Sequence, residues 1–275
     1  MRTLKITTVG SGPLAESIHL QMLRQKAFAG ADVEFRSHAE LPEIERLQNE
    51  RDAIVLALPP GDDVDRYVSA GMLARTSSAR AVVVDTSNKH HGDRGVPLVA
   101  AAYNGRNVRK GRWDGRLVSC PDATTLVAAA FLAPILGHLG DSQVRAVALG
   151  SSPRADIEGE LRKLMKSFPV SFNVMRLPAA EDLGLSVAIF VDSRWAVESS
   201  ALLEILDEAG VSRCATPVEA REAVARGSVA LTQFLQRPQA SEGHFPNSIS
   251  AVLEVDPVPL VAWNAVQTAR YALNL

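Results

Sequence analysis

The opening residues hold the feature that most restricts the fold, a short apolar strand that runs directly into a glycine-rich turn. Residues 4–9 have the composition of a buried strand, and the turn GSGPLA follows at residues 10–15. An amphipathic helix carrying Ile18, Leu20, Met22 and Leu23 is expected next. A strand, a G-x-G-x-x-A turn and a helix form a dinucleotide-binding fingerprint, with pyrophosphate at the helix N-terminus. An ordinary strand-to-helix turn is the alternative. The predicted cofactor contacts in the turn are Gly10, Ser11, Gly12, Pro13 and Leu14.

The second predicted strand, residues 31–36, bears on which dinucleotide would bind. An acidic residue at the end of this strand commonly accepts a hydrogen bond from the ribose 2′-hydroxyl of NAD. Here the strand ends with Arg36 and Ser37, and a guanidinium can pair bidentately with a 2′-phosphate. The sequence therefore favours NADP as the cofactor. NAD stays possible, because Glu34 is close and Arg36 can equally be a surface charge.

Two further apolar strands follow; the first ends in a sharp exit at prolines and the second ends in polar residues. Residues 52–58 end at Leu58, which is followed by Pro59. Residues 81–85 are followed by Thr86 and Ser87. Apolar strands that alternate with helices indicate a parallel sheet covered on both faces. Ligands of such sheets bind beyond the carboxyl ends of the strands. These four residues are therefore additional candidate cofactor contacts.

A later strand end, in residues 118–126, begins a long apolar helix that runs to about Ile135. A helix start offers unpaired N–H groups and the positive end of the macrodipole, which suits a nucleophile or an anionic group. Asp122 is expected to cap this helix, with a role as acid or base as the alternative. Cys120 is expected to be a small core residue. The alternative is that its thiol reaches the ligand-binding crevice beyond the carboxyl ends of the strands.

Beyond about residue 144 the pattern becomes that of an α+β domain. The predicted fold class is α/β, a Rossmann-type doubly wound parallel sheet with a smaller α+β domain for substrate binding or dimerisation. The last helix is predicted to return to the first domain. The expected domains are residues 1–143, 144–256 and 257–275. In the second domain, strands are expected at 144–149, 170–175, 184–192, 228–234 and 249–255, and helices at 157–166, 196–208 and 217–226.

Composition limits the classes of partner. The net charge of −2 gives no electrostatic footprint for nucleic acid. The apolar run at 126–139 is too short to span a membrane, and we see no signal peptide. Two cysteines, Cys120 and Cys214, argue against a disulfide framework. We therefore expect a cytoplasmic protein that binds a small molecule, with no metal site, no nucleic-acid partner and no membrane contact.

Several blocks together resemble the aspartate-semialdehyde dehydrogenases and their relatives, which include the N-acetylglutamyl-phosphate reductases. With the glycine turn they fall in the order of that family and span nearly the whole chain. The resemblance implies a Rossmann domain, an inserted substrate and dimerisation domain, and a homodimer or tetramer. It also implies cofactor contacts from Asn264 and Gln267 in the last helix. The matching blocks are residues 82–88 (VVVDTSN), 96–99 (VPLV), 119–136, 176–178 (RLP), 184–186 (GLS) and 263–269 (WNAVQTA).

The resemblance implies a cysteine nucleophile at the helix start, a histidine that shuttles its proton, and hydride exchange with a nicotinamide. Aligning Pro121 and the following threonines places the nucleophile's position at Ala123. Aligning the later glycine and serine places the histidine's position at Leu185. Alanine has no lone pair with which to attack, and leucine cannot accept a proton. The thioester route is therefore closed at Ala123.

Three hypotheses remain. The first is an NADP-dependent oxidoreductase that reduces a small carbonyl or imine without a thioester intermediate, since hydride transfer itself needs no thiol. The second is a catalytically silent relative that serves as a partner, a regulator or a non-redox biosynthetic protein. The third is a working semialdehyde dehydrogenase that uses Cys120.

Overall fold

The computed structural model describes residues 3–36, 47, 50–59, 64–65, 81–109, 116–150, 156–177, 184–225, 228–238 and 245–275. The contacts divide the chain into two compact units. The first comprises Met1–Pro121 and Val261–Leu275, and the second comprises Asp122–Leu260. Ser37, one of the predicted cofactor contacts, lies outside the described residues.

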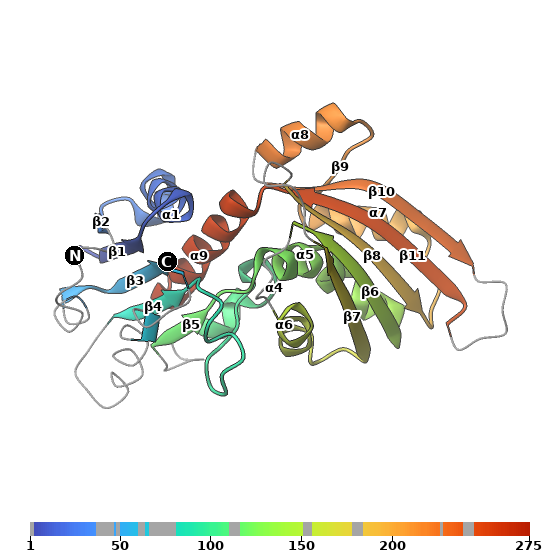
Figure 1. The fold of residues 1–275 in the computed structure, drawn as a ribbon, viewed down its shortest axis with the longest axis horizontal. Coiled ribbons are helices and arrows are strands. Elements are labelled where there is room, and N and C mark those ends of the chain that lie inside the picture. The colour runs from blue at the N-terminus through green and yellow to red at the C-terminus, as the bar shows by residue number, and fades with distance from the viewer. Residues whose placement is uncertain are drawn as a thin grey trace. The chain divides into compact units, whose positions relative to one another are not determined.

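The first unit is built on a five-stranded parallel sheet, as predicted (Figure 1). Its strand order is β2-β1-β3-β4-β5, so the direction in which strands are added reverses between β1 and β3. In sheets of this kind the ligand lies beyond the carboxyl ends of the strands at such a reversal. The strands are β1 (Lys5–Gly10), β2 (Asp32–Arg36), β3 (Ala53–Ala57), β4 (Val82–Asp85) and β5 (Leu117–Ser119).

The central strand β3 is apolar at successive positions, and it therefore buries side chains on both faces of the sheet, because successive side chains of a strand point to opposite sides. On one face Ala53 and Val55 of β3 belong to a core shared with helices α1 (Pro13–Arg24) and α9 (Pro257–Leu273). On the other face Ile54 and Leu56 pack in a separate cluster. The predicted return of the last helix to the first domain is confirmed.

Helix α1 buries only some of its large apolar side chains. Ile18 and Met22, one helical turn apart, are fully buried, as expected for positions i and i+4. Leu20 and Leu23 are 47% and 58% exposed. Within the described part of this unit, the other short elements are η1 (Lys26–Phe28), α4 (Ala101–Asn104) and η3 (Gly105–Val108).

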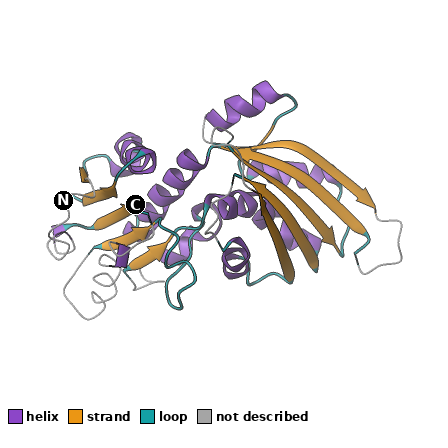
Figure 2. Cartoon of the chain, in the orientation of Figure 1, coloured by secondary structure: helices purple, strands orange, loops and turns teal. Residues whose placement is uncertain are grey.

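The second unit contains a mixed sheet, drawn with orange strands in Figure 2. It has six strands in the order β7-β6-β8-β11-β10-β9. The β6–β7 and β9–β10 pairs are parallel and the other pairs are antiparallel. The strands are β6 (Ser142–Leu149), β7 (Val170–Leu177), β8 (Leu185–Ser193), β9 (Val211–Arg213), β10 (Val229–Pro238) and β11 (Asn247–Val255). The helices are α5 (Ala123–Leu139), α6 (Ile157–Leu164), α7 (Ser199–Glu208) and α8 (Pro217–Ala225).

Burial alternates along the central strands of this sheet. In β6 the side chains of Val144, Ala146 and Ala148 are buried while those between them are exposed or half-buried. Helix α5 packs against β6 and β8 and also against α6 and α7. It is buried around most of its circumference, which explains its near-continuous apolar sequence.

The division between the units differs from the predicted boundary at residue 143. It falls at Pro121, so that α5 belongs with the second unit. The reason is that α5 packs against β6, β8, α6 and α7, all of which lie in that unit. Among the helices of the described ranges, none combines the length and hydropathy that a membrane crossing requires.

Candidate functional site

The glycine turn after β1 has the backbone that the fingerprint requires. Gly10 has φ of 151°, and a Cβ there would lie 2.2 Å from the carbonyl oxygen of Ala57 on β3. Gly12 has φ of 82° and is the N-cap of α1, and a Cβ there would meet nothing within 4 Å. No side chain caps the helix, and Ser11, Gly12 and Pro13 are exposed. The first-turn amides of α1 are thus open to an anionic ligand, which fits a dinucleotide pyrophosphate.

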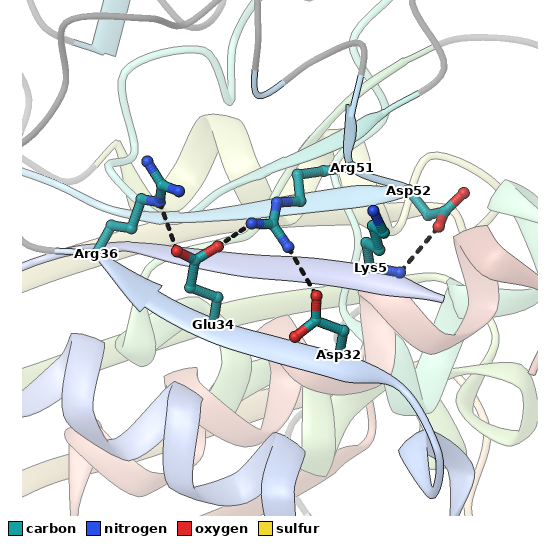
Figure 3. Close-up of polar contacts among 6 residues, drawn as sticks. All are labelled: Lys5, Asp32, Glu34, Arg36, Arg51 and Asp52. Carbon is teal, nitrogen blue, oxygen red and sulfur yellow. Dashed lines mark hydrogen bonds and ion pairs between the residues drawn. The ribbon is translucent and has the colours of Figure 1, made fainter. Parts of the chain in front are cut away.

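The charged residues at the end of β2 form a linked cluster (Figure 3). The Nε of Arg36 donates to Glu34 Oε1 at 2.8 Å. Arg51 donates to the other oxygen of Glu34 through Nη2 and to Asp32 through Nη1 at 3.3 Å. Arg36 therefore already has an acidic partner. The sequence analysis missed Arg51, which precedes β3 and gives no local signal of a contact with β2.

The ends of β3 and β4 are held by hydrogen bonds within the first unit. Thr86 Oγ1 donates to the carbonyl oxygen of Leu56 at 2.7 Å, and the Ser87 amide donates to Asp85 Oδ1 at 2.8 Å. Burial raises the pKa of Asp85, and hydrogen bonds from Ser87 act against this rise. Leu58 is buried, whereas Pro59 is exposed. The polar groups of Thr86 and Ser87 thus fix the strand ends.

The two predicted contacts on α9 have other partners. Asn264 is buried, its Oδ1 accepts the Ala101 amide at 2.7 Å, and its Nδ2 donates to the Val99 carbonyl at 2.9 Å. Gln267 Nε2 donates to Gln25 Oε1 at 3.1 Å. Asn264 therefore ties α9 to the main chain of residues 99–101, and its amide groups are used in that role.

The residues of the turn before α5 cap the helix and pack in the core. Asp122 is the N-cap, and its Oδ1 accepts the Thr124 amide at 2.8 Å, so the expected capping role is confirmed. Cys120 is fully buried in the core that contains Ala262 and Val84, which confirms its expected place in the core. Ala123 is the first helical residue and is half-buried. Cys120 and Cys214 are not joined by a disulfide.

A residue that sequence reasoning missed, Glu160 of α6, lies at this helix start. Its side chain is fully buried. Its carboxyl group accepts the Asp122 amide at 3.2 and 3.1 Å and also the hydroxyl of Thr125. Burial is the main cause that raises its pKa to about 8, and the charge of Asp122 adds to the rise. A signal was present in the sequence, because Glu160 occupies the apolar stripe of α6 with Ile157, Leu161 and Leu164.

Several solved structures resemble the chain over nearly its whole length. No protein-family model matches the chain, and no curated protein matches its sequence. Aspartate semialdehyde dehydrogenase II from Vibrio cholerae matches with a TM-score of 0.78 at 14% identity, covering 99% of each chain. A probable aspartate-semialdehyde dehydrogenase from Pseudomonas aeruginosa gives 0.76 at 16% identity, covering 98% of each chain. Aspartate semialdehyde dehydrogenase with NADP from Candida albicans gives 0.64 at 14% identity, covering 99% of each.

The chain has the fold of the aspartate-semialdehyde dehydrogenases. The likeness that the sequence blocks suggested is confirmed at the level of the fold.

Within this aspartate-semialdehyde dehydrogenase fold, the position aligned with the family histidine lies in a hydrophobic core. Leu185 is 2% exposed and begins β8, in register with Val255 of β11. It shares its face of the sheet with Val187 and Ile189, both fully buried. Leu185 therefore packs in the core of the second unit, and as a leucine it supplies no ionisable group.

Proposed function

We propose that the chain binds NADP(H) and reduces a small carbonyl or imine substrate without a thioester intermediate. The observation that carries this proposal is the glycine turn, in which Gly12 leaves the start of α1 uncapped by any side chain and open. A helix start of this kind binds the pyrophosphate of a dinucleotide through main-chain amides.

The residues assigned to the cofactor follow from that turn. Main-chain amides at the start of α1 hold the pyrophosphate, and Arg36 at the end of β2 holds the 2′-phosphate. Leu58 and Pro59 follow β3, beside β1 at the reversal of strand order. We leave Asn264 out of the cofactor set, because both ends of its amide are bonded to main chain.

The chemistry follows from what the chain lacks at two positions. Ala123 and Leu185 cannot form or assist a thioester, and Cys120 is fully buried. When bound, NADPH supplies a hydride. Reduction of a carbonyl or imine then requires that hydride at carbon and one proton at oxygen or nitrogen, and no thiol takes part. We therefore do not retain the hypothesis of a semialdehyde dehydrogenase that uses Cys120.

The test follows NADPH consumption against a panel of small aldehydes, ketones and imines. We expect turnover of at least one substrate class, unchanged after alkylation of thiols and in a Cys120→Ala variant. Activity that is abolished in the Cys120→Ala variant, with the fold retained, would contradict a thiol-independent route. Phosphate-dependent oxidation of aspartate semialdehyde is the comparison reaction.

A second candidate, a catalytically silent protein that binds the dinucleotide as a ligand, is favoured by Glu160. Its carboxyl group bonds the Asp122 amide and the Thr125 hydroxyl at the start of α5. The Asp122 amide and the Thr125 hydroxyl, which could otherwise donate to an anionic intermediate, therefore already donate to Glu160. Tight NADPH binding with no turnover across the whole panel would select this candidate.

We also propose that the chain is a homodimer. The face of the second sheet opposite to α5 exposes Leu149, Met175, Leu177, Phe190 and Leu235, each 40–58% exposed. Strand register places these side chains on one face, since Leu149 pairs with Leu177 and both Phe190 and Leu235 pair with Ser250. An exposed apolar surface of several large side chains is typical of a subunit interface.

A further inference from the structure

The charge cluster on β2 contains two acids and two arginines that are not equally exposed. The side chains of Asp32, Glu34 and Arg36 lie on one face of β2, because they alternate with Val33 and Phe35. Arg51 comes from the segment before β3, and β1 lies between β2 and β3. The Arg51 side chain therefore reaches across β1 to Asp32 and Glu34 (Figure 3).

Arg51 is the most buried member of the cluster. Its side chain is 10% exposed, whereas those of Glu34 and Arg36 are 30% and 35% exposed. A buried guanidinium against a carboxylate is screened little by water or salt. Arg51 thus offsets the negative charge of Glu34 from inside the fold, although it shares its own charge with Asp32.

Arg36 is held on one edge and left open on the other. It gives its Nε–H to Glu34, and its terminal nitrogens point away from that carboxylate (Figure 3). Those terminal nitrogens are the donors that pair bidentately with a phosphate. Glu34 therefore orients the guanidinium and keeps its phosphate-binding edge available.

An acidic residue on this strand would ordinarily favour NAD, because it bonds the ribose 2′-hydroxyl and repels a 2′-phosphate. We propose that Arg51 is a specificity-determining positioning residue that sets a preference for NADP(H). It offsets the charge of Glu34, so that Glu34 orients Arg36 in place of selecting NAD. This inference rests on the proposed dinucleotide function and concerns the 2′-phosphate end of the same site.

The test compares cofactor preference in Arg51→Gln with that of the wild type. Calorimetric titrations give the dissociation constants of NADPH and NADH, and their ratio is the readout. We expect the ratio to shift toward NADH by about tenfold or more, the contribution of one charge-assisted hydrogen bond. Adenosine 2′,5′-bisphosphate and adenosine 5′-monophosphate should show the same shift, because they probe this end of the site alone.

Three further variants separate positioning from folding. Glu34→Gln/Arg51→Gln should move the ratio back toward the wild-type value, since Arg36 no longer faces an unneutralised Glu34 carboxylate. Arg51→Lys keeps the positive charge but loses the planar fork of the guanidinium, so it should shift the ratio less than Arg51→Gln, and it guards against misfolding. Arg213→Gln, which removes an exposed arginine paired with Asp207 in the second unit, is the matched control and should change nothing.

The outcomes are distinct. If the wild type binds neither dinucleotide, the proposed function itself fails. If it prefers NADPH and Arg51→Gln weakens both dinucleotides equally, Arg51 only supports the fold and this inference is overturned. A wild type that prefers NADH would also overturn it.

Discussion

At the scale of the residue, Glu160 is a buried carboxyl group that should make the stability of the fold depend on pH. Its pKa rises to about 8 in the folded protein from an ordinary value of 4.5, mainly through burial. The folded state therefore keeps a proton on this carboxyl group over a range in which the unfolded chain has lost it. The resulting stability is fully present below the unfolded pKa and is lost as the pH rises through the folded pKa.

We predict that Glu160→Gln flattens this part of the pH dependence. In the wild type the free energy of unfolding should fall by a few kcal/mol between roughly pH 5 and pH 8, at up to about 1.4 kcal/mol per unit. Glutamine has a similar shape but carries no ionisable proton. Urea unfolding at several pH values measures both slopes.

Asp122→Asn is the matched control for this prediction. It retains a side-chain oxygen for the helix cap but removes the charge that helps to raise the pKa of Glu160. The pH slope should persist in this variant and move slightly to lower pH. Equal slopes in the wild type and in Glu160→Gln would show that another group governs the dependence.

Residue-level chemistry was only partly readable from the sequence. The cap at Asp122 and the buried Cys120 follow local rules of helix starts and core composition. The contacts of Arg51 with Glu34 and of Glu160 with Asp122 join residues that lie 17 and 38 positions apart. Periodicity does not specify such pairs, because they depend on how distant elements pack.

At the scale of the element, α9 depends on Asn264 for its attachment to the first unit. The Asn264 amide bonds the buried main chain at Val99 and Ala101, and its helix adds alanines and Val266 to the core beneath. A side chain that satisfies two main-chain groups fixes the helix both along and around its axis. This tie explains the place of Asn264 in the helix without reference to a cofactor.

We predict that Asn264→Ala lowers the free energy of unfolding by about 2 kcal/mol or more, because it leaves two main-chain groups unpaired. Gln267→Ala, also on α9, is the control. Its half-buried amide bonds only side chains, and it should cost less than about 1 kcal/mol. Urea unfolding of both variants decides the matter, and equal losses would refute the special role of Asn264.

The main elements were predictable because their apolar patterns are long and regular. The parallel strands of the first unit and helix α5 were found to within a few residues. Strand β9 has three residues, too few for any periodicity, and the sequence did not indicate it. The boundary at Pro121 was missed because α5 is apolar on nearly every side, so its sequence does not say which unit it joins.

At the scale of the whole molecule, the exposed apolar face of the second sheet is the predicted contact between two copies of the chain. Met175 on β7 is 58% exposed and lies in register with Val147 of β6. Burying a large apolar side chain in an interface contributes about 1.5–3 kcal/mol. A charge placed there would lose this gain and add a desolvation cost.

We predict that Met175→Lys weakens the dimer at least tenfold without loss of fold. Sedimentation equilibrium measures the dissociation constant. Leu23→Lys on α1 is the control, because Leu23 is also 58% exposed but belongs to the first unit and not to this sheet. A wild type that is monomeric at all concentrations, or an equal effect of both substitutions, would contradict the proposed interface.

The central claim is that this chain keeps the dinucleotide end of its fold while the thioester route is closed. Calorimetric titration of the wild type and of Ser11→Asp with NADPH and NADH tests it most directly, with Ser200→Asp at an exposed position of α7 as control. We predict that one NADPH binds per chain, more tightly than NADH, and that a carboxylate beside the start of α1 weakens both at least tenfold. If neither dinucleotide binds the wild type, the claim is wrong.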